Sequence, residues 1–469
     1  MKINRFMIAA PKSGSGKTMI TCALLQLLKD SGKNVLSYKC GPDYIDPMFH
    51  KKVLGVPSKN LDTFFTDEKT TVQLFLDERA DGAFAVLEGV MGLYDGLGGI
   101  YEQGSSYHLA KVTQTPIILV VDAKGMGKSV LALIAGFLQY DTHHLIKGVL
   151  LNRMSKGYYD IIKPLIEKEL SVKVVGYFPE QKDIRLESRH LGLVMPDELL
   201  DIKKQLNETA YRLKKTIDMD LFIYIAEAAD EIGDSENADV YNEKNIGNCD
   251  QNEFTQNINI AVAMDEAFCF YYEDNLRLLE KCGAKLQYFS PLHDTELPDN
   301  CDALLLGGGY PELYAKELSE NISMRKSIKT AFEAGLPTVA ECGGFMYLHT
   351  YIHNQNCVFD MAGALDGECH FKGKLVRFGY IEVEEKHSNF LPPDEKIRAH
   401  EFHYYDSTDN GTDCIATKPA TGRKYDCVIS RDNYWLGFPH IYYPSNPHFA
   451  ENFVKKAQEH ERNKNGKLI

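Results

Sequence analysis

Short apolar runs alternate with amphipathic segments through the first half of the chain. Runs that are apolar at nearly every position predict strands at residues 6–10, 34–39, 83–88, 116–123, 147–153 and 172–178. Between the first two, residues 18–32 have the apolar spacing of a helix and end at Gly32, a residue suited to a helix C-terminus. Strands that are apolar on both faces and separated by helices are typical of a parallel sheet with helices on both sides. The pattern therefore predicts a doubly wound, mostly parallel α/β domain.

The second half of the chain repeats this style. Strands are predicted at residues 258–264, 285–290, 302–308 and 337–341, and helices at 272–282 and 323–335. The last hundred residues favour antiparallel strands, with turn residues gathered at 406–412. A second α/β domain is expected here.

An acidic stretch separates the two halves. Residues 227–253 contain nine Asp or Glu residues against one lysine, Lys244. Such a composition is typical of a solvated linker, because it offers little apolar surface to bury. We therefore expect a first domain over residues 1–225, a linker over 226–256 and a second domain over 257–469.

Charge and hydropathy limit the partners. The net charge of −14 disfavours a nucleic-acid or anionic-membrane surface. The apolar runs fall far short of the ~20 residues that span a bilayer, and the N-terminal residues lack the apolar core and cleavage pattern of a signal peptide. The expectation is a cytoplasmic protein that binds neither nucleic acid nor membrane.

A glycine-rich loop follows the first predicted strand and leads into the first helix. Its residues are Ser13, Gly14, Ser15, Gly16, Lys17 and Thr18. In a phosphate-binding loop, glycines let backbone N–H groups converge on phosphate oxygens, the lysine neutralises phosphate charge and the threonine hydroxyl ligates Mg²⁺. Pro11 replaces the usual opening glycine. The loop predicts ATP binding with Mg²⁺, and the alternative is an ordinary turn.

Acidic residues follow the neighbouring strands. Glu88 ends the strand at 83–88, and Asp46 lies in a loop after the strand at 34–39, so both are candidate Mg²⁺ ligands together with Thr18. The same loops contain four candidate substrate contacts, namely Asp43, Tyr44, His50 and Asp95. Each acid could instead be a turn residue, since Asp beside Pro usually is.

A cysteine after a short strand indicates different chemistry. Cys342 follows the strand at 337–341 and precedes two glycines and a predicted helix, as a nucleophile on a tight elbow does. The helix N-terminus is expected to lower the pKa of this thiol. Gly308 and Gly309, after the strand at 302–308, are candidates for an oxyanion hole. The residues leave the base open among His400, His403, His440 and His448.

Taken together, these motifs resemble the cobyrinic acid a,c-diamide synthases. The resemblance rests on segments 13–18, 41–50, 60–65, 88–96, 189–193, 306–313, 341–348 and 400–406, in that order along the chain. It implies an N-terminal domain like dethiobiotin synthetase and a C-terminal class I glutamine amidotransferase domain. The implied reaction is amidation of the a- and c-acetate carboxylates of cobyrinic acid, with glutamine as nitrogen source and ATP forming acyl phosphates.

The resemblance also implies roles for particular residues. Cys342 corresponds to the glutaminase nucleophile and His440 to its base, while Tyr442 stands where relatives have a second histidine. The usual glutamate two residues after the base is absent, so what orients His440 is left open. Asn152 occupies the position that reads adenine in related proteins, and Arg189 and His190 are candidate contacts to a polycarboxylate corrin-type tetrapyrrole.

Three alternatives stay open. Nickel sirohydrochlorin, or another sirohydrochlorin-derived tetrapyrrole, would be amidated by almost the same motifs. Lys12 resembles the early lysine of partitioning-type ATPase switches, which reaches across a homodimer, and the alternative is an ordinary solvated lysine. That class has no use for Cys342 or the glycines near residue 308, so glutaminase activity discriminates between the two classes.

Overall fold

The computed structural model describes residues 2–77, 82–181, 196–232, 258–354 and 357–466. The chain divides into two compact units, Met1–Tyr241 and Asn242–Ile469. Most of the expected linker, 226–256, lies outside the described residues, as do Arg189 and His190. Among the described residues, no helix combines the length and the apolar character needed to cross a membrane.

The first unit is built on a seven-stranded sheet in the order β3-β2-β4-β1-β5-β6-β7, with every neighbouring pair parallel. This confirms the predicted doubly wound parallel sheet. Its strands are β1 (Asn4–Ala9), β2 (Val35–Cys40), β3 (Ser58–Leu61), β4 (Phe84–Glu88), β5 (Ile117–Asp122), β6 (Ile146–Asn152) and β7 (Lys173–Phe178). The apolar pattern missed β3, because its sequence Ser-Lys-Asn-Leu is mostly polar although all four residues are buried.

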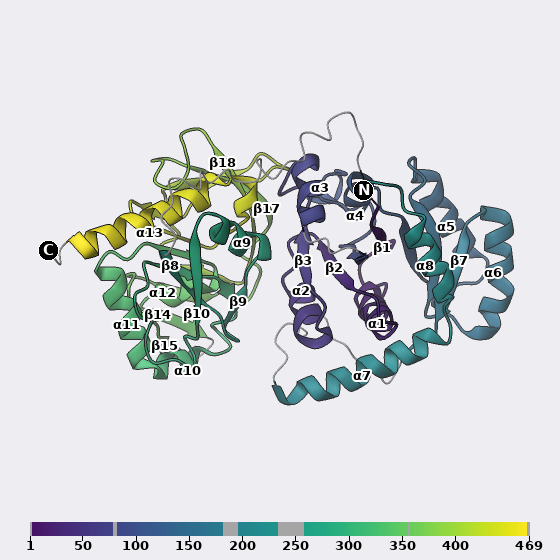
Figure 1. Cartoon of the computed structure of the whole chain (residues 1–469), viewed down its shortest axis with the longest axis horizontal. Coiled ribbons are helices and arrows are strands. Elements are labelled where there is room, and N and C mark those ends of the chain that lie inside the picture. Colours follow the sequence, from purple (N-terminus) through teal and green to yellow (C-terminus); the bar gives the residue numbers. More distant parts are fainter. Residues whose placement is uncertain (1, 78–81, 182–195, 233–257, 355–356, 467–469) are drawn as a thin grey trace. The chain divides into compact units, whose positions relative to one another are not determined.

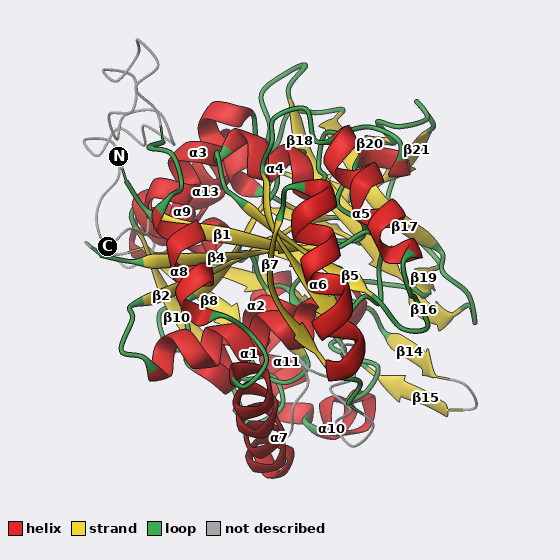
Figure 2. Cartoon of the chain, turned by 90° about the vertical axis from the view of Figure 1, so that its right-hand side faces the viewer, coloured by secondary structure: helices red, strands yellow, loops and turns green. Residues whose placement is uncertain are grey.

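Helices surround this sheet (Figures 1 and 2). They are α1 (Lys17–Asp30), α2 (Ile45–Phe49), α3 (Glu68–Asp77), α4 (Ser106–Val112), α5 (Ser129–Tyr140), α6 (Lys156–Leu170), α7 (Pro196–Lys214) and α8 (Met219–Glu227), and a π-helical turn, η1 (His50–Leu54), follows α2. Apolar side chains of α1, α7 and α8 share one core with side chains of β1, β4, β5 and β6. The parallel sheet brings the carboxyl ends of β1, β2 and β4 to one edge, where a ligand site is expected.

The second unit contains a six-stranded sheet in the order β10-β8-β11-β13-β23-β22, which is parallel except for its last pair. Its strands are β8 (Ile258–Ala263), β10 (Ala284–Phe289), β11 (Ala303–Leu306), β13 (Thr338–Glu341), β22 (Ile429–Arg431) and β23 (Tyr434–Gly437). The helices of this unit are α9 (Glu273–Lys281), α10 (Ala315–Glu320), α11 (Ile322–Glu333), α12 (Gly343–Leu348) and α13 (His448–Gly466). The unit is thus the predicted second α/β domain.

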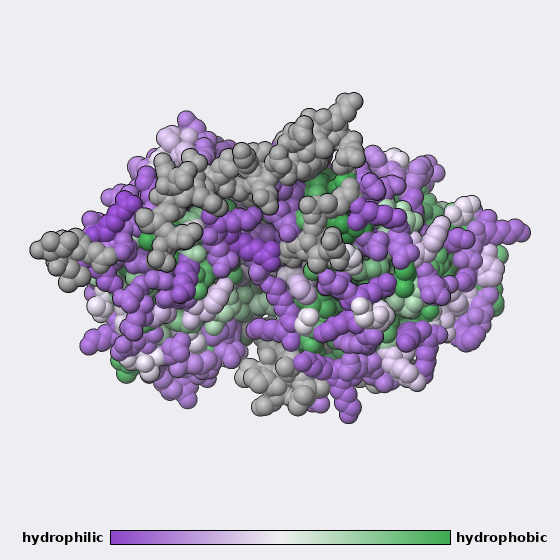
Figure 3. All heavy atoms as spheres, in the orientation of Figure 1, coloured by the Kyte–Doolittle hydropathy of each residue, from purple (hydrophilic) through white to green (hydrophobic). Residues whose placement is uncertain are grey.

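Smaller sheets complete the second unit. An antiparallel sheet contains β17 (Arg377–Glu385), β18 (Lys396–His403), β20 (Cys414–Thr417), β21 (Lys424–Cys427) and β24 (His440–Ile441), as the turn-rich sequence predicts. A four-stranded sheet contains β14 (Tyr351–Asn354), β15 (Cys357–Asp360), β16 (Glu368–Phe371) and β19 (Tyr405–Ser407), and a two-stranded one β9 (Phe268–Phe270) and β12 (Gly308–Gly309). The face of the chain seen in Figure 3 is mainly hydrophilic, with small apolar patches.

Candidate functional site

The loop between β1 and α1 has the conformation of a phosphate-binding loop. Gly14 and Gly16 have φ angles of +74° and +91°, which glycine adopts without strain. The Ser15 hydroxyl donates to the carbonyl of Lys12 at 2.9 Å, which folds the loop back on itself. No side chain caps the N-terminus of α1, so its first N–H groups are available to an anion. Lys12 is exposed.

Asn152 supports this loop from the end of β6. Its side-chain amide donates to the carbonyl of Ser15 at 2.8 Å, and its side-chain oxygen accepts from the N–H of Arg153 at 2.9 Å. A Cβ on Gly16 would lie 2.4 Å from the Asn152 amide nitrogen. One amide hydrogen and one oxygen lone pair of Asn152 thus hold the loop and the end of β6, and its reading of adenine stays a prediction.

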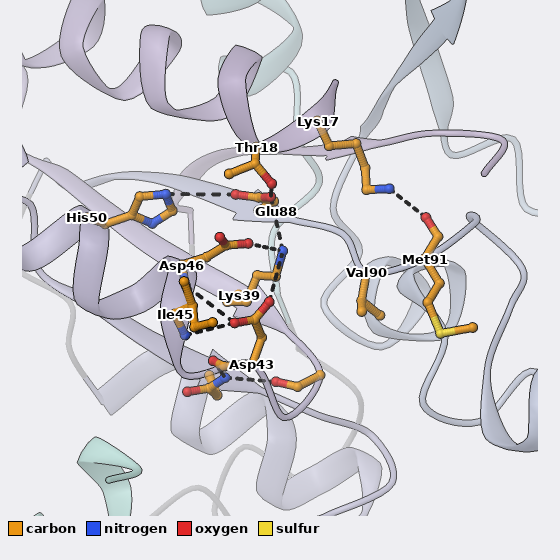
Figure 4. Close-up of polar contacts among 12 residues, drawn as sticks. Lys17, Thr18, Lys39, Asp43, Ile45, Asp46, His50, Glu88, Val90 and Met91 are labelled. Atoms are coloured by element: carbon orange, nitrogen blue, oxygen red, sulfur yellow. Dashed lines mark hydrogen bonds and ion pairs between the residues drawn. The ribbon is translucent and has the colours of Figure 1, made fainter. Parts of the chain in front are cut away.

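Carboxylates gather beside the loop, at the ends of β2 and β4 (Figure 4). The Thr18 hydroxyl donates to Glu88 Oε1 at 2.7 Å. Lys39 Nζ lies 3.0 Å from Glu88 Oε1, 2.5 Å from Asp46 Oδ2 and 3.9 Å from Asp43 Oδ2. The structure thus brings together Thr18, Asp46 and Glu88, the three residues expected to hold Mg²⁺.

The electrostatics of this cluster suit a divalent cation. Burial raises the pKa of Glu88, with repulsion from Asp46 adding to the rise. Burial disfavours the charge of Lys39, but attraction to Asp46 and Glu88 outweighs it and raises the Lys39 pKa well above its usual value. One ammonium thus faces three carboxylates, so negative charge exceeds positive at a site of hard oxygen donors. These residues therefore fit Mg²⁺, which prefers carboxylate and hydroxyl oxygens.

Lys17 reaches from α1 to the loop after β4. Its ammonium donates to the carbonyl of Met91 at 2.5 Å, and burial lowers its pKa to about 8. In the same loop, Asp95 Oδ2 accepts from the N–H of Gly92 at 2.9 Å. Asp95 is also one of the acids whose charge favours the protonated form of Lys17. The loop after β4 therefore lies beside the expected phosphate site.

The other candidate substrate residues of this unit are placed differently. Asp43 Oδ1 accepts from the N–H of Ile45 at 2.8 Å at the start of α2, and Tyr44 is mostly buried beside it. His50 is fully buried. Its Nδ1 forms a hydrogen bond with the Ser37 hydroxyl at 2.9 Å, and its Nε2 lies 3.8 Å from Glu88 Oε2. Burial lowers its pKa to about 4, so it is neutral near pH 7. His50 thus contacts the carboxylate cluster from behind and is not exposed to a substrate.

Cys342 lies on a sharp elbow between β13 and α12. Its φ of +46° is rare for a residue with a side chain, and such strain is typical of functional positions. Its N–H donates to the carbonyl of Gly437 at 2.8 Å, and its carbonyl accepts from the N–H of Met346 at 2.9 Å. Added Cβ atoms on Gly343 and Gly344 would lie 2.9 Å from Pro311 and 2.2 Å from the Leu306 carbonyl oxygen, so only glycine fits after the cysteine. The predicted elbow is therefore present.

His440 and the candidate oxyanion glycines lie beside this elbow. A Cβ on Gly308 would lie 2.3 Å from His440 Cε1, and one on Gly343 would lie 3.0 Å from the N–H nitrogen of Gly309. The strip Gly308–Gly309 thus contacts both the base candidate and the residue after Cys342. Burial lowers the pKa of His440 to about 3, so the imidazole is neutral near pH 7 and able to accept a proton.

The three other candidate histidines are engaged elsewhere. His400 is buried directly opposite His440 on the neighbouring strand. His403 Nδ1 donates to the Tyr405 carbonyl at 2.6 Å, and its ring stacks on Phe438 with centroids 4.0 Å apart. His448 is exposed and paired with Glu395 at 2.9 Å. Of the four, His440 is the one whose ring contacts the glycine strip.

The expected lowering of the Cys342 pKa is wrong for this conformation. Burial raises the thiol pKa far above its usual value, and the negative charge of Glu312 adds to the rise. Helix α12 has only six residues, so its N-terminus does not offset this effect. Cys342 is thus a thiol that needs a base.

Two residues that the sequence reasoning missed are central to these sites. Lys39 lies in β2, whose six residues are all buried. A lysine within an otherwise uncharged strand is the sequence signal that could have identified it. Glu341 precedes Cys342, is 5% exposed, and has Oε2 3.9 Å from His440 Nδ1. Its position before the nucleophile gave no sign of this contact, because the histidine lies about a hundred residues further along the chain.

Comparisons with known proteins agree with these geometries. Residues 6–194 match the CobQ/CobB/MinD/ParA nucleotide binding domain, and residues 259–446 match the CobB/CobQ-like glutamine amidotransferase domain. The chain is therefore a nucleotide-binding domain joined to a glutamine amidotransferase domain.

Sequence similarity to curated relatives extends over most of their length. A cobyrinate a,c-diamide synthase from Caldanaerobacter subterraneus is 38% identical over 93% of this chain and 94% of its own. Proteins with the same name from Clostridium tetani (39%, over 85% and 86%) and Listeria innocua (36%, over 95% and 97%) are similar. The chain belongs to the cobyrinate a,c-diamide synthase family, and it is an amidoligase, a carbon–nitrogen ligase.

Proposed function

We propose that the chain amidates the a- and c-acetate carboxylates of cobyrinic acid in cobalamin biosynthesis, using ATP and glutamine. One observation carries the proposal: a single chain combines a phosphate loop beside an oxygen-ligand cluster with a cysteine elbow beside a neutral histidine. The name shared by its relatives supplies the substrate. Residues 1–225 form the ATP-dependent domain in this proposal, residues 226–256 the linker and residues 257–469 the glutaminase.

The first unit activates the carboxylate. A carboxylate is a poor acyl donor because its oxygen is a poor leaving group, and transfer of the γ-phosphoryl group of ATP converts it to an acyl phosphate. The N–H groups of loop 13–18 and the Lys17 ammonium bind the phosphates. Asp43, Tyr44 and Asp95 lie on the loops around this site and contact the tetrapyrrole, as do Arg189 and His190 in this proposal.

Thr18, Asp46 and Glu88 would hold Mg²⁺. When bound, the ion supplies positive charge that stabilises the transferring phosphoryl group. Lys39 limits repulsion within the cluster by contacting Asp46 and Glu88. His50 packs against Glu88, with its Nε2 3.8 Å from Glu88 Oε2.

The second unit releases ammonia from glutamine. His440 takes the proton of Cys342, and the sulfur attacks the side-chain amide of glutamine. The N–H groups of Gly308 and Gly309 stabilise the oxyanion, the nitrogen leaves as ammonia, and water then hydrolyses the thioester. Glu341 faces His440 Nδ1 at 3.9 Å and fixes the orientation of the ring, so in this proposal it takes the part of the missing third triad residue.

Replacement of the nucleophile separates the two halves of this reaction. The variant Cys342→Ala is expected to lose glutamine-dependent amidation and to keep amidation with ammonium salts, since only the second unit needs the thiol. ADP release and product masses measure both activities. Cys357→Ala, which removes an exposed cysteine, is the matched control. Loss of both activities in Cys342→Ala with wild-type stability would contradict the division of labour.

The substrate is tested with the wild-type chain. The enzyme is incubated with Mg²⁺-ATP, glutamine and either cobyrinic acid or nickel sirohydrochlorin, and the masses of the products are measured by mass spectrometry. Doubly amidated cobyrinic acid is the expected product. Turnover of the nickel compound alone would keep the chemistry and change the substrate, while ATP hydrolysis without any amide would favour the partitioning-type switch.

A further inference from the structure

Three metal-ligand side chains, none of them assigned a role above, converge on one sheet of the second unit. His353 lies on β14, and Glu368 and His370 lie on β16. Glu368 Oε2 is 2.9 Å from His353 Nε2 and 3.4 Å from His370 Nε2. All three ligand atoms lie within 4.8 Å of one another. We propose that His353, Glu368 and His370 bind one divalent transition-metal ion of the zinc class.

The strand register builds this cluster. His353 and His370 are direct partners across the parallel pair β14–β16, and Glu368 is two residues before His370, on the same face. The alternating residues Ile352 and Cys369 are fully buried in the core on the other face. The backbone therefore fixes the three donors on the outer face of the sheet before any ion binds.

The geometry suits a zinc-type ion. A tetrahedral ion bound at about 2.0–2.2 Å holds its ligand atoms roughly 3.3–3.6 Å apart, and Glu368 Oε2 lies 2.9 Å and 3.4 Å from the two histidine nitrogens. The two imidazole rings stack with centroids 4.2 Å apart and 22° between their planes, and both Nε2 atoms approach the same carboxylate oxygen. Two imidazoles and one carboxylate are a ligand set for Zn²⁺, Co²⁺ and Ni²⁺.

Partners around the cluster hold the ligands in place. The N–H of Glu368 donates to the Thr408 hydroxyl at 3.0 Å, and the N–H of Thr408 donates to the Glu368 carbonyl at 3.0 Å. Within the described part of the chain, Glu368 forms ion pairs with His353 and His370. Asp406 is the partner of His370 on β19, so a further carboxylate lies one strand away.

The side-chain exposures leave room for an ion with an open coordination position. The side chains of His353, Glu368 and His370 are 30%, 40% and 35% exposed, so solvent reaches the cluster. A bound ion would cross-link β14 to β16. Strand β14 starts three residues after α12 ends, and its Asn354 donates to the Glu312 carbonyl at 3.0 Å. A cross-link at β14 would therefore restrict the motion of the segment that follows the cysteine elbow.

Metal titration of the full chain tests the proposal. After treatment with a chelator, Zn²⁺ and Co²⁺ are titrated by calorimetry, and stoichiometry is read by native mass spectrometry. We expect one tight site, at least roughly tenfold weaker in His353→Ala and in His370→Ala. The Co²⁺ spectrum should lack a thiolate charge-transfer band, because no cysteine is a ligand.

Two control variants separate this site from other metal ligands. His293→Ala removes a surface histidine paired with Glu266 at 3.0 Å and should bind metal like the wild type. Cys357→Ser removes an exposed thiol from β15 opposite Asn354 and should also have no effect. Glu368→Gln, which keeps the side-chain shape, replaces the alanine variants if these fail to fold.

The outcomes are distinct. Binding that the variants of His353, His370 and Glu368 all retain at wild-type strength would overturn the proposal. An equal loss in His293→Ala, or a thiolate band abolished by Cys357→Ser, would also overturn it, because the metal would then bind elsewhere. Since the site uses no residue of the proposed amidation, either proposal can fail without the other.

Discussion

At the scale of single residues, the chemistry of both sites depends on charges that burial has forced together. Lys39 stabilises two carboxylates that would otherwise repel each other at the ends of β2 and β4. Glu341 is buried 3.9 Å from His440, and burial raises its pKa well above the usual value. In the proposed mechanism each residue acts through a neighbour and not on a substrate, so we propose each as a positioning residue.

The role of Glu341 can be tested by Glu341→Gln. We expect kcat for glutamine hydrolysis to fall by roughly tenfold to a hundredfold with little change in KM. The expected loss is smaller than the ~10⁴-fold loss of kcat that follows replacement of a hydrogen-bonded triad aspartate, because Glu341 and His440 are 3.9 Å apart. The measurement is glutaminase kinetics over a range of pH.

Amidation with ammonium salts should be unchanged in Glu341→Gln. Glu395→Gln, which alters an exposed pair with His448, serves as the control and should retain full glutaminase activity. A wild-type kcat in Glu341→Gln would remove Glu341 from the mechanism.

At the scale of elements, both sites use a strand, a tight turn and a helix. The first turn lies between β1 and α1, and the second between β13 and α12. In each, a glycine is needed because a neighbouring group approaches too closely for a Cβ: Asn152 at Gly16, and the Leu306 carbonyl at Gly344. The turns are therefore fixed by contacts from other strands as well as by their own sequence.

Gly16→Ala and Gly14→Ala separate these two effects. Both positions have positive φ, so alanine costs about 1–2 kcal/mol of strain at either one. Only at Gly16 would the Cβ also clash, 2.4 Å from the Asn152 amide nitrogen, whereas Gly14 has open space. We expect Gly16→Ala to weaken ATP use at least roughly tenfold more than Gly14→Ala, measured with ammonium salts as nitrogen source. Equal effects would mean that support from Asn152 is unimportant.

At the scale of the whole molecule, the chain divides its chemistry between two compact units, each with its own sheet and core. The second unit buries histidines in their neutral form. Burial lowers the pKa of His349 to about 4 and those of His400 and His440 to about 3. Their burial makes the stability of this unit depend on pH.

The buried histidines are expected to lower the stability of the second unit as the pH drops. In the unfolded chain these histidines bind protons near pH 6.5, whereas in the folded chain they stay neutral until about pH 4 or below. Between about pH 6.5 and pH 4 the three histidines therefore take up about three protons on unfolding, which lowers the free energy of unfolding as the pH falls, while the raised pKa of Glu341 acts in the opposite direction. Trp435, the only tryptophan, is buried in this unit, so its fluorescence in urea titrations reports the transition.

One variant isolates this effect. His349→Gln removes one buried titrating group and should make the fall in stability with decreasing pH less steep. His448→Ala removes an exposed histidine and should leave the slope unchanged. If His349→Gln has the wild-type slope, buried histidines do not cause the dependence.

The sequence by itself determined the α/β class of both halves, the phosphate loop and the cysteine elbow. These are local features: apolar periodicity sets strands and helices, and glycines beside Lys17 or Cys342 set the turns. The polar strand Ser58–Leu61 escaped this reasoning, because its burial comes from pairing with β2 and not from apolar side chains.

Only the tertiary structure decided which distant residues meet. It placed His440, and not His400, His403 or His448, against the glycine strip, brought Glu341 to His440, and set Lys39 among the carboxylates. It also gave Asn152 a supporting contact and raised the Cys342 pKa that the helix terminus was expected to lower. These facts depend on strand order, register and burial, which arise when segments far apart in the sequence pack together.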